Sequence, residues 1–156
     1  MNFNIILPRL GESRERWADK ADRAIDTYYP DRAKHGIPPA LPLEAYTGTY
    51  FHPGYLNFTI ELAEEGKKTR PKAGLTATRR DATWPTYNEF VHVSGEYWMM
   101  YLHTLGLPDG VRDKEYAPVQ FRVGPDGKAD ALGITFISVE PEQDTVEGLI
   151  WFERVA

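Results

Sequence analysis

Cysteine is absent from this chain of 156 residues. Disulfide bonds, thiolate nucleophiles and cysteine-ligated metal sites are therefore excluded. Long hydrophobic runs are also missing, because no apolar stretch approaches the roughly 20 residues of a membrane-spanning helix. Residues 1–8 lack the basic start and the long apolar region of a signal peptide, so we expect a cytoplasmic location.

Strong charge of either sign is missing as well. The 18 Lys and Arg residues are outnumbered by 23 Asp and Glu residues, which gives a formal net charge of −5. This mild acidity argues against nucleic acid as a partner. What the chain does have is a hydrophobic fraction of 42%, with 13% aromatic residues, in a length typical of one domain. Such a composition excludes a disordered protein and predicts a packed core.

One helix is predicted near the N-terminus, over residues 13–28. Ser13 is suited to cap its first turn, and Pro30 ends it. The Pro-rich segment up to residue 42 favours extended backbone and is expected to be a linker. We therefore divide the chain into a helical arm with linker, residues 1–42, and a second unit, residues 43–156. The helix should bury one apolar face, formed by Trp17, Ala21, Ala24, Ile25 and Tyr28.

From residue 43 the pattern changes to short β-runs separated by turn signals such as Pro53-Gly54. Several runs alternate apolar and polar residues, as in 58–62 and 119–123, which predicts one buried face per strand. Eight such strands can close into a barrel, which fills its own interior or holds one small ligand. The fold class is thus an all-β, eight-stranded antiparallel barrel with an N-terminal helical arm. The predicted strands are 44–51, 56–63, 73–79, 87–93, 96–103, 116–123, 129–138 and 146–154.

The segment Leu-Glu-Ala-Tyr-Thr-Gly-Thr-Tyr-Phe-His-Pro-Gly-Tyr, residues 43–55, carries a family resemblance. It is similar to the start of the lipocalin-like domain at the C-terminus of serine β-lactamase-related, penicillin-binding-protein-like proteins. Segments 90–95, 121–127 with 132–134, and 150–154 fit the same domain. The resemblance implies a lipocalin-like barrel, and the Met1 start favours a stand-alone protein over an excised domain.

The nucleophile of that family is missing here. The parent enzymes use a Ser-x-x-Lys motif, whereas the three serines of this chain are each followed three residues later by another residue type. These pairs are Ser13 with Arg16, Ser94 with Tyr97, and Ser138 with Pro141. β-Lactamase or peptidase chemistry is therefore not carried over with the resemblance.

The four histidines, His35, His52, His92 and His103, lack the compact spacing of a helical zinc motif, so neither a metal nor a cofactor is expected. His92 and His103 lie on adjacent predicted strands and are the one pair that could meet. His92 also shares strand parity with Phe90, which is predicted to face the interior. It is either a hydrogen-bonded core histidine or a polar anchor or general acid/base in an apolar pocket.

Three further features have two readings each. Residues 97–103 are large and apolar on both faces, so one face can fill the barrel while the other packs under the helix; alternatively, they line an adaptable ligand pocket. Gly48, between Tyr46 and Tyr50, leaves space for a ligand or marks a bend with packing tyrosines. Trp84 is a lid residue or packs on the barrel mouth.

Glu61 and Glu89 lie in strands on the faces opposite the apolar sets.

The first functional hypothesis is a cofactor-independent cyclase or isomerase, including a Diels–Alder-type enzyme. Its substrate would be a hydrophobic terpenoid or polyketide intermediate of fungal secondary metabolism. A shaped cavity would hold the reacting ends together, and a few donors would polarise the substrate. The hypothesis rests on analogy with lipocalin-like barrels that serve as cyclases. The catalytic candidates are His92, Tyr50 and Tyr101, and the substrate-binding candidates are Tyr46, Phe58, Phe90, Trp98, Met100, Phe121 and Phe136.

The alternative hypothesis is a non-catalytic ligand-binding or accessory domain that docks on a β-lactamase-like hydrolase. A module of this kind should have an interior filled by its own side chains and an exposed apolar patch. An enzyme should instead have an open cavity with His92 or a tyrosine reaching into it. The expected partner is a hydrophobic small molecule, with a homodimer as a further possibility.

Overall fold

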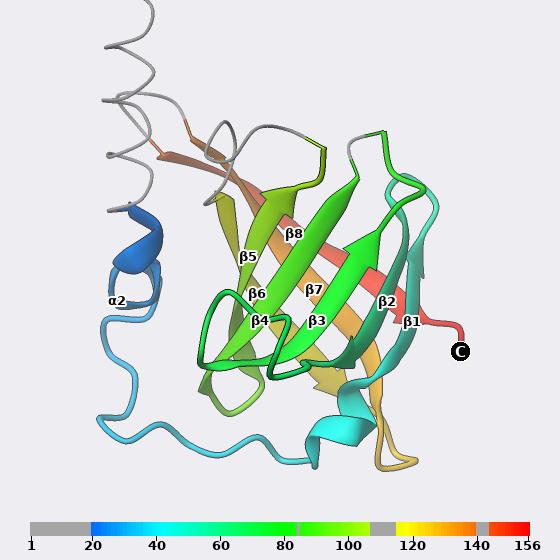
Figure 1. Ribbon diagram of the computed structural model, residues 1–156. Helices are drawn as coiled ribbons and strands as arrows, with labels where there is room; N and C mark the ends of the chain where they lie inside the picture. The colour runs from blue at the N-terminus through cyan, green and yellow to red at the C-terminus, as the bar shows by residue number, and fades with distance from the viewer. Residues whose placement is uncertain (1–19, 84, 107–114, 140–143) are drawn as a thin grey trace, which may run out of the picture.

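The computed structural model describes residues 20–83, 85–106, 115–139 and 144–156, and within them the chain forms a closed barrel of eight strands. Every strand pairs antiparallel with the next, and the last pairs with the first (Figure 1). The fold class predicted from the sequence is therefore confirmed. The elements are helix α2 (Ala24–Tyr28), the 3₁₀ turn η1 (Leu43–Tyr46), and strands β1 (Gly48–His52), β2 (Leu56–Leu62), β3 (Ala73–Arg79), β4 (Thr86–Ser94), β5 (Tyr97–Thr104), β6 (Glu115–Val123), β7 (Ala129–Val139) and β8 (Asp144–Arg154).

The start of the first strand is the main boundary that the sequence misplaced. Leu43–Tyr46 forms the turn η1, where the predicted strand 44–51 had already begun. The amide of Ala45 donates to the carbonyl oxygen of Pro42 at 2.9 Å, and the amide of Thr47 donates to that of Glu44 at 3.3 Å. These local bonds close a turn instead of a ladder, so β1 begins only at Gly48.

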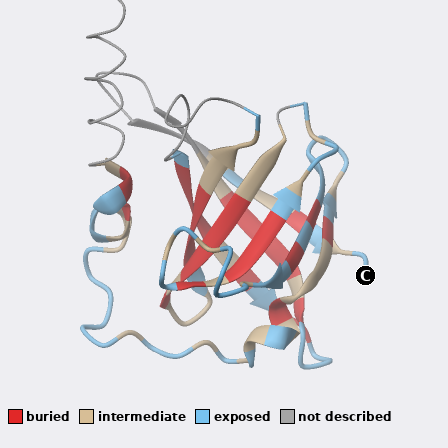
Figure 2. Cartoon of the chain, viewed as in Figure 1, coloured by how far each residue is buried: buried red, intermediate tan, exposed pale blue. Residues whose placement is uncertain are grey.

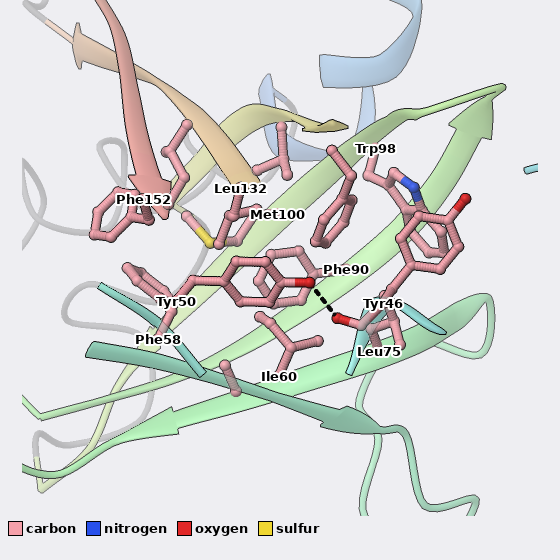
Figure 3. Packing of buried hydrophobic residues seen from close by; sticks show 14 of the residues in the cluster. Tyr46, Tyr50, Phe58, Ile60, Leu75, Phe90, Trp98, Met100, Leu132 and Phe152 are labelled. Carbon is pink, nitrogen blue, oxygen red and sulfur yellow. Dashed lines mark hydrogen bonds between the residues drawn. The ribbon is translucent and has the colours of Figure 1, made fainter. Parts of the chain in front are cut away.

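The interior of the barrel holds one large apolar cluster. Inward-facing residues of all eight strands contribute to it, together with Tyr46 from η1 (Figure 3). The ring of Tyr46 lies against Trp98 and Phe121, with centroids 5.9 and 5.0 Å apart. In Figure 1 the segment after α2 runs beneath the barrel to η1, so this end of the barrel is covered by the turn.

A second apolar cluster lies outside the barrel. Ala21 and Ala24 of the helical arm are fully buried and belong to one cluster with Ala73 of β3, Val91 of β4, and Met99 and Tyr101 of β5. Figure 1 shows the arm beside the barrel, and Figure 2 shows buried residues in both. This confirms the apolar helix face predicted from the spacing, apart from residues 13–19, which lie outside the described part of the chain. Over the described residues, no helix is both long and apolar enough to cross a membrane.

Candidate functional site

The predicted substrate-binding residues come together inside the barrel and fill it. Six of the seven are at most 4% exposed and belong to the interior cluster, while Phe136 is partly buried at its margin. Aromatic edges meet faces throughout, as where Phe58 packs on Phe152 with centroids 5.2 Å apart (Figure 3). Two depressions are lined by described residues and lie on the outside of the barrel. In the described part, the interior is thus a packed core.

Tyr50 lies inside this core, and its hydroxyl already has a protein partner. The hydroxyl donates a 2.8 Å hydrogen bond to the main-chain oxygen of Tyr46 (Figure 3). Burial raises the pKa of Tyr50 to about 12, against the opposing effect of the nearby Arg154 guanidinium. The predicted catalytic donor is therefore neutral at physiological pH and engaged in holding η1 to β1.

His92 lies half-buried near the β4–β5 turn. Its Nε2 lies 2.9 Å from the carbonyl oxygen of Gly95, and its ring meets Trp98 edge-on with centroids 4.9 Å apart. His92 pairs with Trp98 and so keeps the inward parity predicted for it, and the strand register shifts only after it, between His92 and Ser94. These contacts match the hydrogen-bonded histidine that the sequence left open. A role in acid–base chemistry stays a prediction.

Tyr101 lies on the other side of the sheet. It belongs to the outer cluster under the helical arm, and the Arg70 guanidinium lies 3.5 Å from its ring centroid. Burial also raises its pKa. The three catalytic candidates therefore do not converge: Tyr50 is inside, Tyr101 is outside, and His92 is at one end. Tyr101 lies outside because odd-numbered residues of β5 face outward, and a catalytic role for the three residues stays a prediction.

Gly48 does not leave free space for a ligand. A Cβ atom at this position would lie 2.5 Å from the carbonyl oxygen of Ala156 and 2.8 Å from the Arg154 guanidinium. The Arg154 side chain donates to the carbonyl oxygens of Ala45, Thr47 and Ala129. The room at Gly48 is therefore taken by the end of the chain and by the arginine, which hold the β1–β8 seam.

Glu89 forms a buried polar cluster that the sequence did not reveal. Its side chain is 0% exposed, although it lies on the outer face of β4. It accepts hydrogen bonds from the amides of Thr69 and Arg70, both within about 3.1 Å for one carboxylate oxygen, and from the Thr69 hydroxyl. His103 Nε2 lies 3.1 Å from the same carboxylate. The loop between β2 and β3 is thus fastened over a carboxylate that a strand-parity argument places in solvent.

The histidines do not form a metal centre in the described residues. Strand pairing sets His103 opposite Tyr87 and His92 opposite Trp98, so the two imidazoles are separated along the sheet. No group of three His, Asp or Glu side chains among the described residues could hold an ion. His52 accepts a 2.9 Å hydrogen bond from the amide of Gly54 and packs on Tyr55.

Two polar atoms inside the barrel lack partners. Asn88 is fully buried, and its Nδ2 donates to Ala77 and Thr86, but its Oδ1 has no partner. The indole Nε1 of Trp98 is likewise unpaired. At the hairpin end Tyr55 stacks on Phe136 with centroids 5.0 Å apart. Trp84, the suggested lid residue, lies outside the described residues.

An aromatic surface lies on the outside of β5 to β8. Tyr97 is 49% exposed and Leu149 is 39% exposed, although both sit on strands. Beside them a groove of about 240 Å³ runs between the helical arm and the sheet. Its lining is mostly aromatic and apolar, without a charged residue: Tyr28, Tyr29, Tyr97, Pro118, Val119, Gln120 and Thr135. Exposed aromatic surface of this kind is typical of protein–protein contacts.

Comparison with known proteins gives one family. A model described as "Domain of unknown function (DUF3471)" matches residues 32–154. The chain belongs to the DUF3471 family. Its match thus covers the end of the linker and the whole barrel. No solved structure matches the DUF3471 chain.

Two curated relatives whose names state an activity match as well. One is the unguisins hydrolase ungD' of Aspergillus campestris (strain IBT 28561), 36% identical over 144 residues, which are 92% of this chain and 24% of the relative. The other is the unguisins hydrolase ungD of Aspergillus violaceofuscus (strain CBS 115571), 33% identical over 171 residues, 98% of this chain and 27% of the relative. The chain therefore spans about a quarter of the length of the curated relatives it matches. Neither name supports the cyclase or isomerase expectation.

Proposed function

We propose that this chain is the non-catalytic barrel of a hydrolase-type protein related to serine β-lactamases. In this proposal it binds the hydrolase portion through the outer face of β5 to β8. The observation that carries the proposal is the interior of the barrel. Tyr50, Phe90 and Trp98 are packed against their neighbours, so the described interior is built as a core and not as a substrate cavity.

Two further observations support the same function. The relatives named hydrolases are about four times as long as this chain, so the matched region is a small part of each. The chain itself lacks a Ser-x-x-Lys motif and cysteine. A hydrolytic nucleophile of the serine β-lactamase type would therefore come from the remaining three quarters of such a protein.

The aromatic surface on β5 to β8 fits this partner. Tyr97 and Leu149 are exposed on strands, and the groove beside them is not charged. Tyrosines combine a large contact area with a polar hydroxyl, which suits the moderately polar interfaces between domains. The proposed occupant is the hydrolase portion. A second copy of the chain is an outcome that the test distinguishes.

A replacement experiment in the Aspergillus campestris relative tests the function. Three proteins are compared: the full relative, the relative without its matched quarter, and the relative with this chain in that place. Unguisin hydrolysis and thermal unfolding are measured for each, and hydrolysis is measured for this chain alone. We expect no turnover by the chain alone, and recovery of stability and turnover when it replaces the missing quarter. Turnover by the isolated chain, or full function without any barrel, would overturn the proposal.

The docking surface has a matched pair of variants. Leu149→Asp in the replacement protein should loosen the interface, because it puts a charge into the aromatic surface. Leu62→Asp on β2 is the control, since Leu62 is similarly exposed, at 43%. Loss of stability with Leu149→Asp alone supports the surface, and equal behaviour of both variants contradicts it. If Leu149→Asp instead dissociates a dimer of the isolated chain, the occupant is a second copy.

Five expectations from the sequence stay predictions: the cyclase hypothesis, a hydrophobic small-molecule substrate, a homodimer, the exclusion of nucleic acid, and a cytoplasmic location. None of the contacts described above favours the first of them.

A further inference from the structure

A depression with a different chemistry lies outside the barrel. It has a volume of about 380 Å³ and forms where residues 32–38 cross the end of β4. Its lining contains no Asp or Glu, although acidic residues outnumber basic ones in the chain as a whole. Its ionisable lining residues are Arg32, Lys34, His35, Lys72 and His92.

The wall of this depression is fixed by hydrogen bonds. The amide of Ile37 donates to the Ser94 hydroxyl at 2.9 Å, and the amide of Gly95 donates to the carbonyl oxygen of Ile37 at 2.7 Å. Gly36 adopts a φ of +63°, and a Cβ atom there would lie 3.0 Å from the carbonyl oxygen of Val93. The segment therefore holds its basic residues against β4 in a defined shape and does not cross the surface loosely.

Most of the positive charge in the depression is not compensated. Arg32 pairs with Asp26 at 2.5 Å and also donates to the carbonyl oxygen of Tyr29. Lys34, His35 and Lys72, in contrast, have neither a hydrogen bond nor an ion pair with any residue that the structure describes. Like charges gathered without a counter-charge repel one another, and an anion bound among them removes that repulsion.

Apolar side chains complete the depression. Val91 and Val93 lie on β4, Ile25 lies on α2, and Ile37 and Pro38 lie on the crossing segment. A ligand that fills this space should therefore combine an anionic head with a short apolar part. The same combination excludes a bare polyanion as the best fit, because it would leave the apolar wall uncovered.

We propose that this depression is a binding site for a small organic anion, a carboxylate with a short aliphatic chain, held by Lys34 and Lys72. The site is separate from the aromatic surface on β5 to β8, since the two share no lining residue. It lies outside the barrel, and His92 alone among its lining residues also contacts Trp98 of the interior cluster among the ring contacts described. The inference does not depend on the proposed docking function.

Binding of four probes to the full chain tests the chemistry. Hexanoate carries both parts of the ligand, acetate only the carboxylate, hexan-1-ol only the chain, and inorganic phosphate only a different anionic head. We expect hexanoate to bind tighter than acetate and hexan-1-ol, with NMR shifts confined to the lining residues, and to weaken as salt rises. If phosphate binds there tighter than hexanoate, or no probe shifts these residues, the proposal is wrong.

A pair of double variants tests the residues. Lys34→Gln with Lys72→Gln removes two charges from the depression, whereas Lys67→Gln with Lys128→Gln removes two charges from exposed loops elsewhere. All four side chains are exposed, so both proteins should fold as the parent does. The first variant should bind hexanoate about tenfold more weakly at low ionic strength, and the second should match the parent. Equal weakening in both would reduce the effect to net charge and overturn the site.

Discussion

The hydroxyl of Tyr50 donates a 2.8 Å hydrogen bond to the main-chain oxygen of Tyr46 inside the barrel. The Tyr46 hydroxyl in turn donates to the Glu96 carboxylate at 2.6 Å, in the turn between β4 and β5. Two tyrosines four residues apart thus join β1, η1 and the β4–β5 turn. They close one end of the barrel by hydrogen bonds as well as by apolar contacts.

Replacing Tyr50 by Phe should destabilise the fold. The ring still fills its place, but the Tyr46 carbonyl oxygen loses its donor in a site without water access, which costs about 1–3 kcal/mol. Chemical denaturation measures the change in the free energy of unfolding. Tyr97→Phe is the control, because Tyr97 is half exposed and should change stability by less than about 0.5 kcal/mol. Equal effects in the two variants would show that the Tyr50 hydroxyl does not hold η1.

Alkaline pH should unfold the protein through its buried tyrosines. Burial raises the pKa of Tyr29 and of Tyr50 to about 12 from an ordinary value of 10.0. The unfolded chain therefore loses these protons at lower pH than the folded chain does. The stability that the two protonated tyrosines contribute is fully present below pH 10 and is lost as pH rises towards 12. Tyrosinate absorbance and denaturation, followed together over this window, check the prediction. With Tyr50→Phe the pH dependence should become shallower, and an unchanged slope would contradict the assignment to Tyr50.

The sequence was sufficient for the fold because alternation and turn chemistry are local signals. In β5, for example, the parity of residues 97–103 correctly separated the interior side chains Trp98 and Met100 from the outer ones, Met99 and Tyr101. That separation depends only on the pleat of a strand. The filled interior was not predictable in the same way, because it depends on how eight strands close around one another.

The site predictions failed where long-range contacts override parity. Glu89 was placed correctly on the outer face, yet the loop carrying Thr69 and Arg70 buries it. His92 kept its predicted parity, since it pairs with Trp98, but it is the last residue before a register shift, where its ring meets the Gly95 carbonyl oxygen. No local sequence pattern predicts that a loop 20 residues away covers a strand. Contacts of this kind can therefore be identified only from the folded structure.

Replacing Gly48 by Ala should open the β1–β8 seam. Gly48 has a φ of +140°, which a residue with a Cβ adopts only with strain. The added methyl group would also meet the carbonyl oxygen of Ala156 at 2.5 Å. We expect a loss of about 2 kcal/mol or more, measured by denaturation. Gly66→Ala is the matched control, since nothing lies within 4 Å of its Cβ position. A seam that tolerates Gly48→Ala as well as Gly66→Ala would mean that the chain end is not held there.

Replacing Glu89 by Gln should free the loop between β2 and β3 while leaving the barrel closed. Both main-chain amides donate to one oxygen of the carboxylate, and the other oxygen meets the Thr69 hydroxyl and His103. Glutamine keeps one acceptor oxygen but loses the negative charge, and hydrogen bonds to charged groups contribute about 1.5–3 kcal/mol each, more than neutral ones. Hydrogen exchange should therefore show lost protection at the amides of residues 69 and 70, with the strand amides protected as before.

Glu61→Gln on β2 is the control for this prediction. Glu61 is exposed, and its substitution removes the same amount of charge. It should leave exchange at residues 69 and 70 unchanged, since a surface carboxylate contributes little to stability. If both variants release the loop equally, net charge and not the buried carboxylate governs it. If neither does, the loop is held by the Arg70 guanidinium over the Tyr101 ring, at 3.5 Å, and Arg70→Gln is the variant that would release it.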